Sequence, residues 1–559
     1  MSSRNRVAAI MLSAVFTLAN GGVARAADDT VLKAMGDELD RSISNLRLEQ
    51  KAKPYFIGYR CTDDKRLRFT YELGKKAEDE RQENRVVDVD MHAGDFRFDN
   101  TADLVGRSPR DRSRYLPLDD NYDGIRRLLW VVTDDSYKDA GEEYERQEAY
   151  KHGHIIRNIT DSFSQAKPVE SISTDTPELK LKEDWEKRLA SLSTVFAKYP
   201  EIRKSWAVME AERQIFRIAN TEGTRVRFTW TPLVLGITAF ARTPDGEDVW
   251  DCDYFRVVNE NDMPTQEELE ARADALAKNL VDYTKAERKN YYFGPVLFEQ
   301  QASGEILQHG IAPKLVALPG DNLHPSGTFL RSIDHRILPK FLSISDDPSA
   351  TKFGAQPIPG PYQFDDDGVP CKTVKLVDKG YLKELLSSRT PVLPDMKSNG
   401  HNFSNQVLPT TLIMQSEKPT NVRVMEKRLL QLAKDQGLKE AIIVRRVVPQ
   451  TAKLMHGDAE GARSDSLEGC TPLEVYSVDV ATGKETRVRG LRFRGFDLGT
   501  MQEIVAAGND AKPYNTVNWA GFVRTVVAPS LLLSHMEMEE DGRDTLSPYP
   551  LQNPYFAKK

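Results

Sequence analysis

The sequence predicts an α+β protein, with an N-terminal α/β-sandwich-like domain followed by a β-rich C-terminal domain. Three observations support this prediction. Apolar residues recur at helical spacing in several long segments, as they do at Val31, Met35 and Leu39. Segments that alternate with period two occur in both halves of the chain. Glycine and proline turns interrupt the second half at short intervals, which favours many short strands there.

Residues 1–26 have the three-part form of a secretory signal. Arg4 and Arg6 charge the first part, residues 7–18 are apolar, and residues 24–26 read Ala-Arg-Ala, a typical cleavage site. About a dozen apolar residues are too few to cross a bilayer, which needs about 20. No cysteine stands at the cleavage point, which argues against a lipoprotein. We therefore expect export to a bacterial periplasm and no membrane span in the mature chain.

The charge balance argues against a nucleic-acid partner. Removal of the signal takes away three arginines and no acid, so the net charge changes from −7 to −10. Non-specific binding to nucleic acid or to anionic membranes needs clustered lysine and arginine. The four cysteines lie far apart and form no CxxC, so disulfides and buried free thiols both stay open.

The N-terminal domain is expected over residues 27–289. Strands and helices should both occur in it, with a linker before the helix that is predicted over 185–196. The predicted elements are a helix over 31–46, strands 54–62 and 67–73 paired across a turn at 63–65, strands 85–91 and 95–98, a helix from 125 through 140, a solvated helical stretch to 154, a linker over 168–182 and a helix over 185–196.

A hairpin and a capped helix complete this domain. Residues 214–219 and 224–231 alternate around the turn Asn220-Thr221-Glu222-Gly223, and residues 233–242 continue the sheet. Thr265 and Glu268 have the spacing of a capping box, with Thr265 as N-cap of a long helix. That helix ends in the charged run before residue 290, where we place the domain boundary.

The C-terminal domain is expected over residues 290–559. Strands are predicted over 372–377 and 441–448 with a helix over 424–436 between them, and 453–468 has the composition of an exposed insertion. Asp365, Asp366 and Asp367 are possible cation ligands. Adjacent side chains of one extended segment do not converge, so a solvated turn is the better interpretation.

The stretch from Gly294 to Leu315 carries the main candidate site. An apolar strand-like opening is followed by a segment of helical spacing, in which Glu305 and His309 stand four residues apart. On an α-helix such a pair lies on one face. A carboxylate and an imidazole placed in this way suit metal ligation, or a general base beside a metal ligand. An ordinary Glu–His contact on a solvated helix is the competing interpretation.

The residues around this pair resemble the TldD/PmbA family, the gyrase modulators. The similarity covers roughly residues 210–540, and the order of several short motifs carries it. These motifs are Asn220-Thr221-Glu222-Gly223, the GPVxL-type strand at 294, Phe364-Asp365-Asp366-Asp367-Gly368-Val369-Pro370, Ser398-Asn399-Gly400-His401, Ala506-Ala507-Gly508-Asn509-Asp510 and Val527-Ala528-Pro529-Ser530-Leu531-Leu532-Leu533. The resemblance implies the family fold, dimeric assembly with itself or with a family partner, and, for active members, a zinc metallopeptidase.

The zinc motif departs from the family pattern. Family enzymes carry HExxxH and a cysteine near the C-terminus; Glu305 and His309 match the second and last positions, but Gly304 replaces the first histidine. No cysteine follows Cys470, and the segment where the ligand cysteine falls reads KPYNTVNW from residue 512. By resemblance, Glu305 is the candidate general base and His309 the candidate zinc ligand. The family also contains non-catalytic members with such losses.

Two functions therefore stay open. The first is an exported metallopeptidase-like protein that acts on peptides or unfolded chains. In it, one of His324, His335, His401 or His456 would complete a rearranged metal site with Glu305 and His309. The second is a non-catalytic peptide-binding protein or partner subunit of the same family. The sequence contains no G-x-S-x-G, P-loop or Rossmann fingerprint that would favour another chemistry.

Overall fold

A computed structural model describes most of the chain. It covers residues 29–49, 51–102, 104, 113–154, 160–181, 184–318, 329–449, 467–517 and 523–540. The expected signal, nearly all of the expected insertion at 453–468, His324 and His456 lie outside these ranges. No helix within them is both long and apolar enough to cross a membrane.

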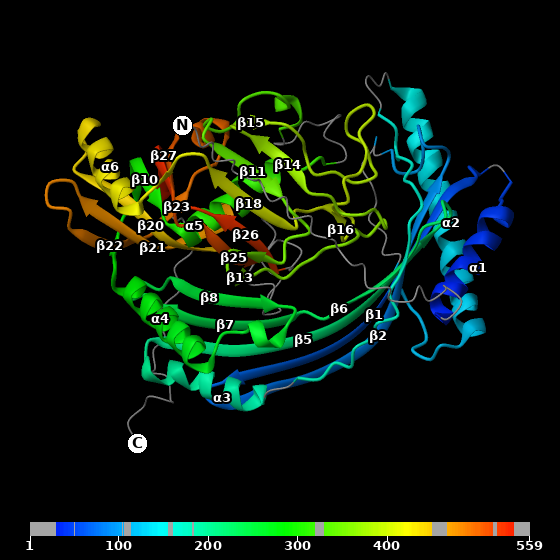
Figure 1. Ribbon diagram of the computed structural model, residues 1–559, viewed down its shortest axis with the longest axis horizontal. Coiled ribbons are helices and arrows are strands. Elements are labelled where there is room, and N and C mark those ends of the chain that lie inside the picture. Colours follow the sequence, from blue (N-terminus) through cyan, green and yellow to red (C-terminus); the bar gives the residue numbers. More distant parts are fainter. Residues whose placement is uncertain are drawn as a thin grey trace, which may run out of the picture.

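The described N-terminal half forms an eight-stranded sheet with long curved strands (Figure 1). Its centre consists of three antiparallel strands of 19 residues each: β1 (Pro54–Glu72), β2 (Lys75–Ala93) and β5 (Ile202–Asn220). β5 pairs along its other edge with β6 over one half and with β7 over the other. The remaining strands are β3 (Arg114–Tyr115), β4 (Glu170–Ile172), β6 (Arg225–Trp230), β7 (Leu233–Arg242) and β8 (Asp248–Val257).

The predicted turn at residues 63–65 is wrong, because β1 runs through it without a break. Asp63 lies opposite Arg85 on β2 and Ile215 on β5. Its carboxylate accepts a hydrogen bond from Arg85 Nη2 at 2.8 Å and lies 3.0 Å from Arg217 Nη1. Two guanidinium groups therefore hold the Asp63 carboxylate inside the sheet. Aspartate is common in turns, but at this position it lies within a strand.

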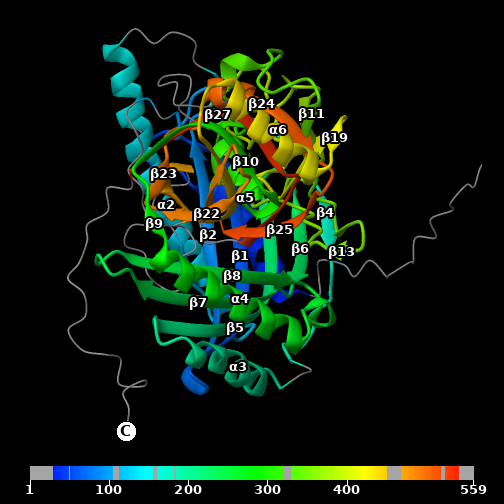
Figure 2. The same ribbon diagram turned by 90° about the vertical axis from the view of Figure 1, so that its left-hand side faces the viewer.

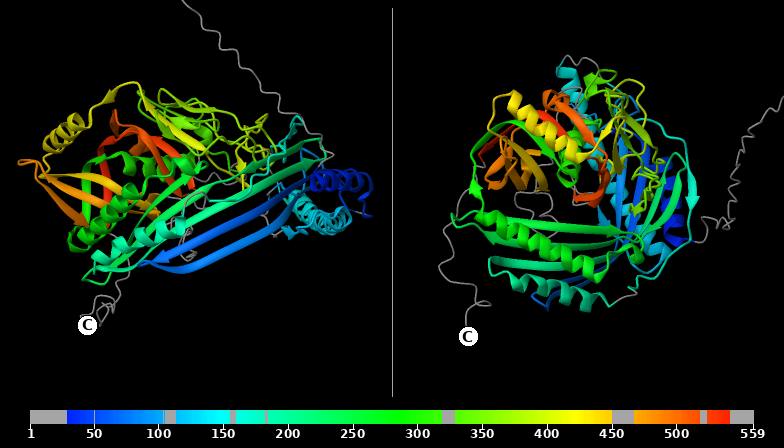
Figure 3. Two further views of the ribbon diagram at one scale, coloured as in Figure 1. Left: turned by 60° about the horizontal axis from the view of Figure 1, so that its bottom comes forward. Right: turned by 60° about the vertical axis from the view of Figure 1, so that its left-hand side comes forward.

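Two pairs of helices cover opposite ends of this sheet (Figure 3). α1 (Thr30–Asn45) and α2 (Tyr122–Gly153) contact each other at one end, and α3 (Trp185–Thr194) and α4 (Gln266–Lys285) contact each other at the other end. The capping box of α4 is confirmed. Residues 95–98 form a turn closed by a bridge from Gly94 to Asp99 rather than the predicted strand, and the predicted linker contains β4.

The C-terminal half contains two main sheets. Among the described strands, nine form one sheet: β9 (Glu287–Arg288), β10 (Tyr291–Phe298), β19 (Pro419–Thr420), β20 (Glu440–Pro449), β21 (Cys470–Asp479), β22 (Glu485–Arg489), β23 (Leu491–Phe493), β24 (Ile504–Gly508) and β27 (Leu531–Glu540). Six form the other: β11 (Leu342–Asp346), β14 (Val374–Asp378), β15 (Tyr381–Leu382), β18 (Thr411–Ser416), β25 (Lys512–Val517) and β26 (Val523–Ala528). The predicted mixture of helices and sheets is thus confirmed.

Short elements complete this half. They are α6 (Val422–Asp435), α7 (Leu498–Gln502) and the hairpins β12 (Lys352–Phe353) with β13 (Gln356–Pro357) and β16 (Asn402–Phe403) with β17 (Gln406–Val407). α6 confirms the helix predicted over residues 424–436, and it packs against β10 and β20. In the side view, β22 and β25 lie above α4 and β8, which they contact (Figure 2).

Arginine ion pairs join the two halves. Arg446 on β20 donates to both carboxylate oxygens of Asp251 on β8, at 2.7 and 2.9 Å, and Asp251 is fully buried. Arg489 at the end of β22 lies 3.0 Å from Glu247. Arg60 on β1 pairs with Asp366 of the C-terminal half. These contacts fix how the β-rich half lies on the N-terminal sheet, and they frame the space between the two.

The interpretation of residues 365–367 as a solvated turn is wrong. Asp365 is buried and accepts hydrogen bonds from the backbone N–H groups of Asp367 and Val369, at 3.1 and 2.9 Å. Gly368 has φ +72°, and a Cβ there would lie 2.9 Å from Thr224 Cγ2. This turn is therefore packed tightly against the N-terminal hairpin, which explains a glycine at a position of positive φ.

Candidate functional site

Glu305 and His309 lie on a helix held between the two C-terminal sheets. The helix begins as α5 (Gln300–Glu305) directly after β10 and contacts β20 on one side and β25 and β26 on the other. From Ile306 to Ile311 it continues as a π-helix, not as the regular α-helix expected. Pro313 has no N–H to donate to the carbonyl of His309, which disfavours α-helical hydrogen bonding here. π segments of this kind are frequent at functional sites.

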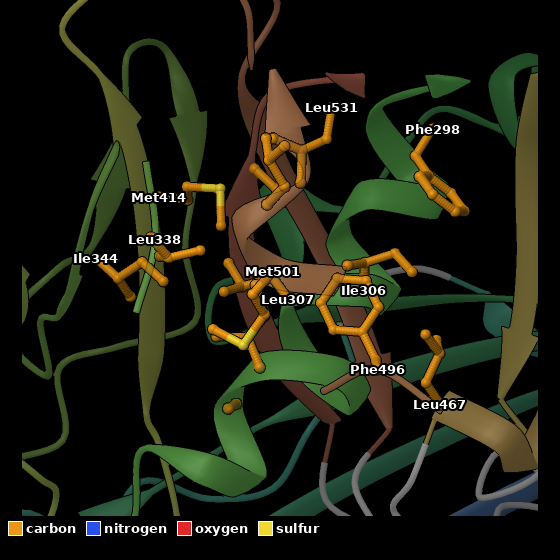
Figure 4. Packing of buried hydrophobic residues seen from close by; sticks show 14 of the residues in the cluster. Phe298, Ile306, Leu307, Leu338, Ile344, Met414, Leu467, Phe496, Met501 and Leu531 are labelled. Atoms are coloured by element: carbon orange, nitrogen blue, oxygen red, sulfur yellow. The ribbon is translucent and has the colours of Figure 1, made fainter. Parts of the chain in front are cut away.

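Apolar packing fixes this helix on the side away from the site. Ile306 and Leu307 are fully buried, and Figure 4 shows them among Phe496, Met501 and other core side chains. A Cβ on Gly310 would lie 2.9 Å from Phe496 Cδ1, so the ring of Phe496 rests directly on the π segment. The helix therefore cannot rotate to present other residues, and Glu305 and His309 are held where the structure places them.

The structure brings the two predicted residues into contact. His309 Nε2 lies 3.2 Å from Glu305 Oε2, and both side chains are fully buried. The same carboxylate oxygen accepts a hydrogen bond of 2.9 Å from Thr516 Oγ1 on β25. Gln301, one turn earlier, lies at 3.4 Å from the other carboxylate oxygen. The Glu305 carboxylate is thus surrounded by an imidazole, a hydroxyl and a carboxamide.

Tyr514 occupies the space beside Gly304. A Cβ built on Gly304 would lie 3.1 Å from Tyr514 Cδ1 and 3.2 Å from Val526 Cγ2. The Tyr514 hydroxyl accepts a hydrogen bond of 2.8 Å from Gln301 Nε2, which holds the ring in place. Burial, followed by the nearby Glu305, keeps the pKa of Tyr514 well above its ordinary value, so the phenol stays protonated. A larger side chain at position 304 would need this space.

These donors do not fit a catalytic zinc ion. Glu305 and His309 are close enough to share one metal, since zinc binds oxygen and nitrogen ligands at about 2.0–2.2 Å. Catalytic zinc has three protein ligands, however, and the described residues contain no group of three histidine, cysteine, aspartate or glutamate side chains that could hold a metal. Gly304 offers no donor, and the β25 side chains that reach the helix are a phenol and a hydroxyl.

Two of the histidines predicted as possible zinc ligands, His335 and His401, lie within the described residues and have different roles. His335 is exposed and bonds to the carbonyl of Ile333. His401 is fully buried and its Nε2 lies 2.8 Å from Asp346 Oδ2. Asp346 also accepts hydrogen bonds from the backbone N–H groups of Thr410 and Thr411, at 3.0 and 2.9 Å. His401 therefore fixes the loop before β18, and it does not complete a cluster with Glu305 and His309.

A large cavity begins next to this site, at Gln308 of the π segment. Its volume is about 840 Å³, and both halves of the chain line it. Gln308, Ala312 and Pro313 contribute the wall nearest to His309. The opposite walls come from β1, β2, α2 and the loops of the C-terminal half between residues 366 and 409. Cavities of this size between two domains are typical ligand sites.

Charged residues line one side of the cavity. Arg60 pairs with Asp88 at 2.8 Å and with Asp366. Burial, together with the charges of Asp90 and Asp366, raises the pKa of Asp367 to about 6 against the opposing effects of Arg389 and Asn402. His92 has Asp99 Oδ2 2.6 Å from its Nδ1, and although burial alone would lower its pKa, Asp90 and Asp99 raise it to about 9.

The sequence located part of this arrangement. Glu305 and His309 were found through their spacing, and the structure confirms that they meet. Tyr514 and Thr516 were read only as the segment that lacks the family cysteine; their alternate positions on a strand are a signal that they face one side. Arg60, His92 and Gln308 were missed, since nothing in their local sequence marks a cavity formed by distant segments.

Comparisons with known proteins show what this chain is similar to. Residues 291–540 match the family described as the PmbA/TldA metallopeptidase C-terminal domain. No curated protein sequence matches the chain. Among solved structures, TldE from Thermococcus kodakarensis is 12% identical with a TM-score of 0.57, over 90% of this chain and 100% of that one. Two candidate DNA gyrase modulators are also similar in fold.

The modulator from Thermotoga maritima is 16% identical with a TM-score of 0.56, over 90% of this chain and 99% of that one. The modulator from Bacteroides thetaiotaomicron is 12% identical with a TM-score of 0.58, over 91% and 98%. At these identities the structures establish a shared fold that extends over the N-terminal half, beyond the region of the family match.

Proposed function

Because residues 291–540 form a C-terminal domain of the PmbA/TldD family, we propose that this chain is a non-catalytic member that binds polypeptide segments. One observation carries the proposal: Tyr514 fills the space beside Gly304, where family enzymes have their first histidine. Thr516 and His309 meanwhile hold the Glu305 carboxylate inside the protein. The family scaffold is retained, and the described residues contain no group of three side chains that could hold zinc.

The position of Glu305 supports a structural role. A general base must reach the proton it removes, directly or through one water. Glu305 is fully buried and its nearest polar neighbours are Thr516, His309 and Gln301. The adjacent cavity, by contrast, is large enough for several side chains of an extended polypeptide. A polypeptide that binds without being hydrolysed needs only this cavity and not the buried Glu305 carboxylate.

We further propose where the protein works and in what form. The charged, apolar and Ala-Arg-Ala parts of residues 1–26 support export to a periplasm. The family fold supports assembly, either of two copies of this chain or with a family partner. Light scattering of the purified mature protein at micromolar concentrations tests the second point, and a monomer at all concentrations contradicts it.

The proposal is tested by three measurements on one preparation of the mature protein. We expect less than 0.1 zinc per chain by elemental analysis, no chelator-sensitive cleavage of an unfolded polypeptide after zinc addition, and saturable binding of fluorescent peptides by anisotropy. Asp378→Asn, at a partly exposed residue of β14 that pairs with Lys375, serves as the control variant. One zinc per chain, together with cleavage that Glu305→Gln abolishes, would overturn the proposal.

The 3.2 Å separation of Glu305 Oε2 and His309 Nε2 favours one second candidate, a metallopeptidase whose third ligand comes from outside the described residues. In that case His309→Ala removes stoichiometric zinc and cleavage together. Glu305→Gln then lowers the cleavage rate by about 10²–10⁴-fold, the usual contribution of a general base. Retention of full peptide binding by both variants, without any cleavage by the parent protein, supports the non-catalytic function.

A further inference from the structure

The cavity between the two halves is acidic, and the carboxamide oxygen of Gln308 in its wall accepts no hydrogen bond from the described residues. We propose that it selects a cationic group, the ammonium or guanidinium of a lysine or arginine side chain in a bound polypeptide, with Asp367 and Gln308 as the accepting residues. This inference rests on the proposed function, because it names the kind of polypeptide that the cavity takes. It adds a chemical preference that polypeptide binding alone does not require.

The charges of the lining residues favour a cation. The acids are Asp88, Asp90, Asp139, Glu143, Asp366 and Asp367, and the basic groups are Arg60 and His92. The basic groups are already committed: Arg60 binds Asp88 and Asp366, and His92 lies between Asp99 and Asp90. The surplus of acidic charge in a partly enclosed cavity raises the local concentration of positive ligands.

Asp367 accepts one hydrogen bond among the described residues. Asn402 Nδ2 donates to its Oδ1 at 2.9 Å. Within the described residues no other hydrogen bond reaches its side chain. Burial raises its pKa to about 6, and the charge of nearby Arg389 offsets this rise only in part. Asp366, by comparison, accepts from Arg60 and from the Ser404 N–H. Arg389 directs its hydrogen bonds to Ser164 and Glu222, so a cation in the cavity would supply the direct charged donor that Asp367 lacks.

Gln308 provides an independent observation. It is only 3% exposed, and it lines the cavity from the π segment next to His309. Its carboxamide oxygen accepts no hydrogen bond from the described part of the chain. A buried amide oxygen without a donor costs about 1–3 kcal/mol, so such a group in a cavity wall indicates a ligand that donates. An ammonium or guanidinium group is a donor without an acceptor.

The remaining walls suit the stem of a basic side chain. Phe56, Phe163, Val316 and Leu408 line the same cavity. Lysine and arginine place an aliphatic stem along apolar surface and their charge at a polar end. The cavity offers both surfaces together, whereas a short acidic or purely apolar side chain would leave one of them unsatisfied. This combination favours polypeptides with a lysine or arginine side chain over polypeptides without one.

The test uses peptides acetylated at the N-terminus and amidated at the C-terminus, so that the side chain is the only cation. Each twelve-residue peptide carries one central residue, which is lysine, its neutral analogue norleucine, or glutamate. We expect the lysine peptide to bind at least 10-fold more tightly than the norleucine peptide, as a charged hydrogen bond implies. Asp367→Asn should abolish this difference and leave the norleucine affinity unchanged.

Three variants of the protein complete the peptide experiment. Asp367→Asn keeps the oxygen that Asn402 binds, so it should fold, and Gln308→Leu should reduce the preference as well. Asp378→Asn, far from the cavity wall, should keep the preference intact. Wild-type binding of lysine and norleucine peptides with equal affinity would overturn the inference. Failure of every peptide to bind would overturn the proposed function itself.

The cation can also come from a free polyamine, so spermidine is included as a competitor. Spermidine binding that is lost in Asp367→Asn, without binding of the lysine peptide, would overturn the polypeptide source. The pH gives a further readout. Asp367 faces Asp365, Asp366, Asp90 and Arg389, and its ionisation near pH 6 should strengthen lysine binding between pH 5 and 7. His92, with a pKa of about 9, keeps its charge over that interval.

Discussion

Tyr514 and Gly304 are complementary: the ring carbon Cδ1 of Tyr514 lies 3.1 Å from the position that a Cβ on Gly304 would take. The two residues are 210 positions apart in sequence, on a helix and on the strand β25 beside it. Each explains the other, because the small residue leaves a space and the large one fills it. The missing histidine is therefore part of a repacked site, and restoring it should disturb the packing.

We predict that Gly304→His destabilises the protein by about 1–3 kcal/mol, the usual cost of overpacking a buried site. Tyr514→Ala, which opens a cavity, should cost about 3–5 kcal/mol by itself. The double variant should lose clearly less than the sum, because the new imidazole occupies the vacated space. Denaturant unfolding of the four proteins measures this coupling.

Tyr476→Ala, on β21, serves as the comparison for that cycle, since its ring lies against Arg445 and not against the helix. Paired with Gly304→His it should give additive losses. Additive losses for the Tyr514 pair as well would show that the two positions do not compete for one space.

Thr516 should stabilise the protein through its hydroxyl group. Thr516→Val keeps the shape and removes the donor to Glu305 Oε2, so we expect a loss of about 1–3 kcal/mol in the free energy of unfolding. Thr516→Ser retains the hydroxyl and should lose less than about 1 kcal/mol, the value of one buried methyl group. Equal losses for the two variants, measured by denaturant unfolding, would rule out the hydrogen bond as the cause.

Two neighbouring aspartates on β1 should respond in opposite ways. Asp63→Asn removes a carboxylate from Arg85 and Arg217 and should cost about 3–5 kcal/mol, since both guanidinium groups are buried. One carboxylate oxygen of Asp64 accepts no hydrogen bond from the residues that the structure describes, and burial raises the pKa of this side chain. Asp64→Asn should therefore be neutral within about 0.5 kcal/mol or stabilising. Thermal unfolding of both variants at pH 7 tests the contrast.

His92 should make stability fall as pH rises above neutrality. Its pKa is raised from 6.5 to about 9 by Asp90 and Asp99, against the effect of burial. The charged imidazole therefore contributes fully below about pH 6.5, and this contribution is lost as pH rises through about 9. The raised pKa corresponds to on the order of 3 kcal/mol.

The measurement is the difference in unfolding free energy between wild type and His92→Gln at pH 6, 7, 8 and 9. The difference should shrink steadily over this range, since other titrating groups are common to both proteins. A constant difference would mean that His92 acts through its stacking on Phe163, at 4.0 Å between ring centroids, and not through its charge.

Expression in a bacterial host with an intact export pathway should yield a periplasmic protein whose N-terminus is Ala27. The reason is the cleavage motif at residues 24–26 behind a short apolar segment. N-terminal sequencing of the periplasmic fraction gives the answer. An Arg25→Asp and Ala26→Leu double variant should retain the signal, because large residues at the cleavage point block processing, and a cytoplasmic chain that begins at Met1 would contradict export.

Local patterns in the sequence predicted much of the fold. The spacing of Val31, Met35 and Leu39 predicted α1, and Thr265 with Glu268 predicted the capping box of α4, because both signals act within a few residues. The turn Asn220–Gly223 was likewise confirmed by Gly223 at φ +102°. Local signals were wrong at Asp63, where ion pairs to distant arginines override turn preference, and at Asp365, which is buried by packing against another domain.

By itself, the sequence determined the fold class, the family resemblance and the pairing of Glu305 with His309, because each depends on residues close together or on motifs in fixed order. It also showed that Gly304 lacks a side chain. Only the tertiary structure decided what replaces the missing ligands and what surrounds them. Tyr514 and Gln308 acquire their roles from strands and loops hundreds of residues away. Contacts of that kind are set by the packing of whole sheets, which no local spacing encodes.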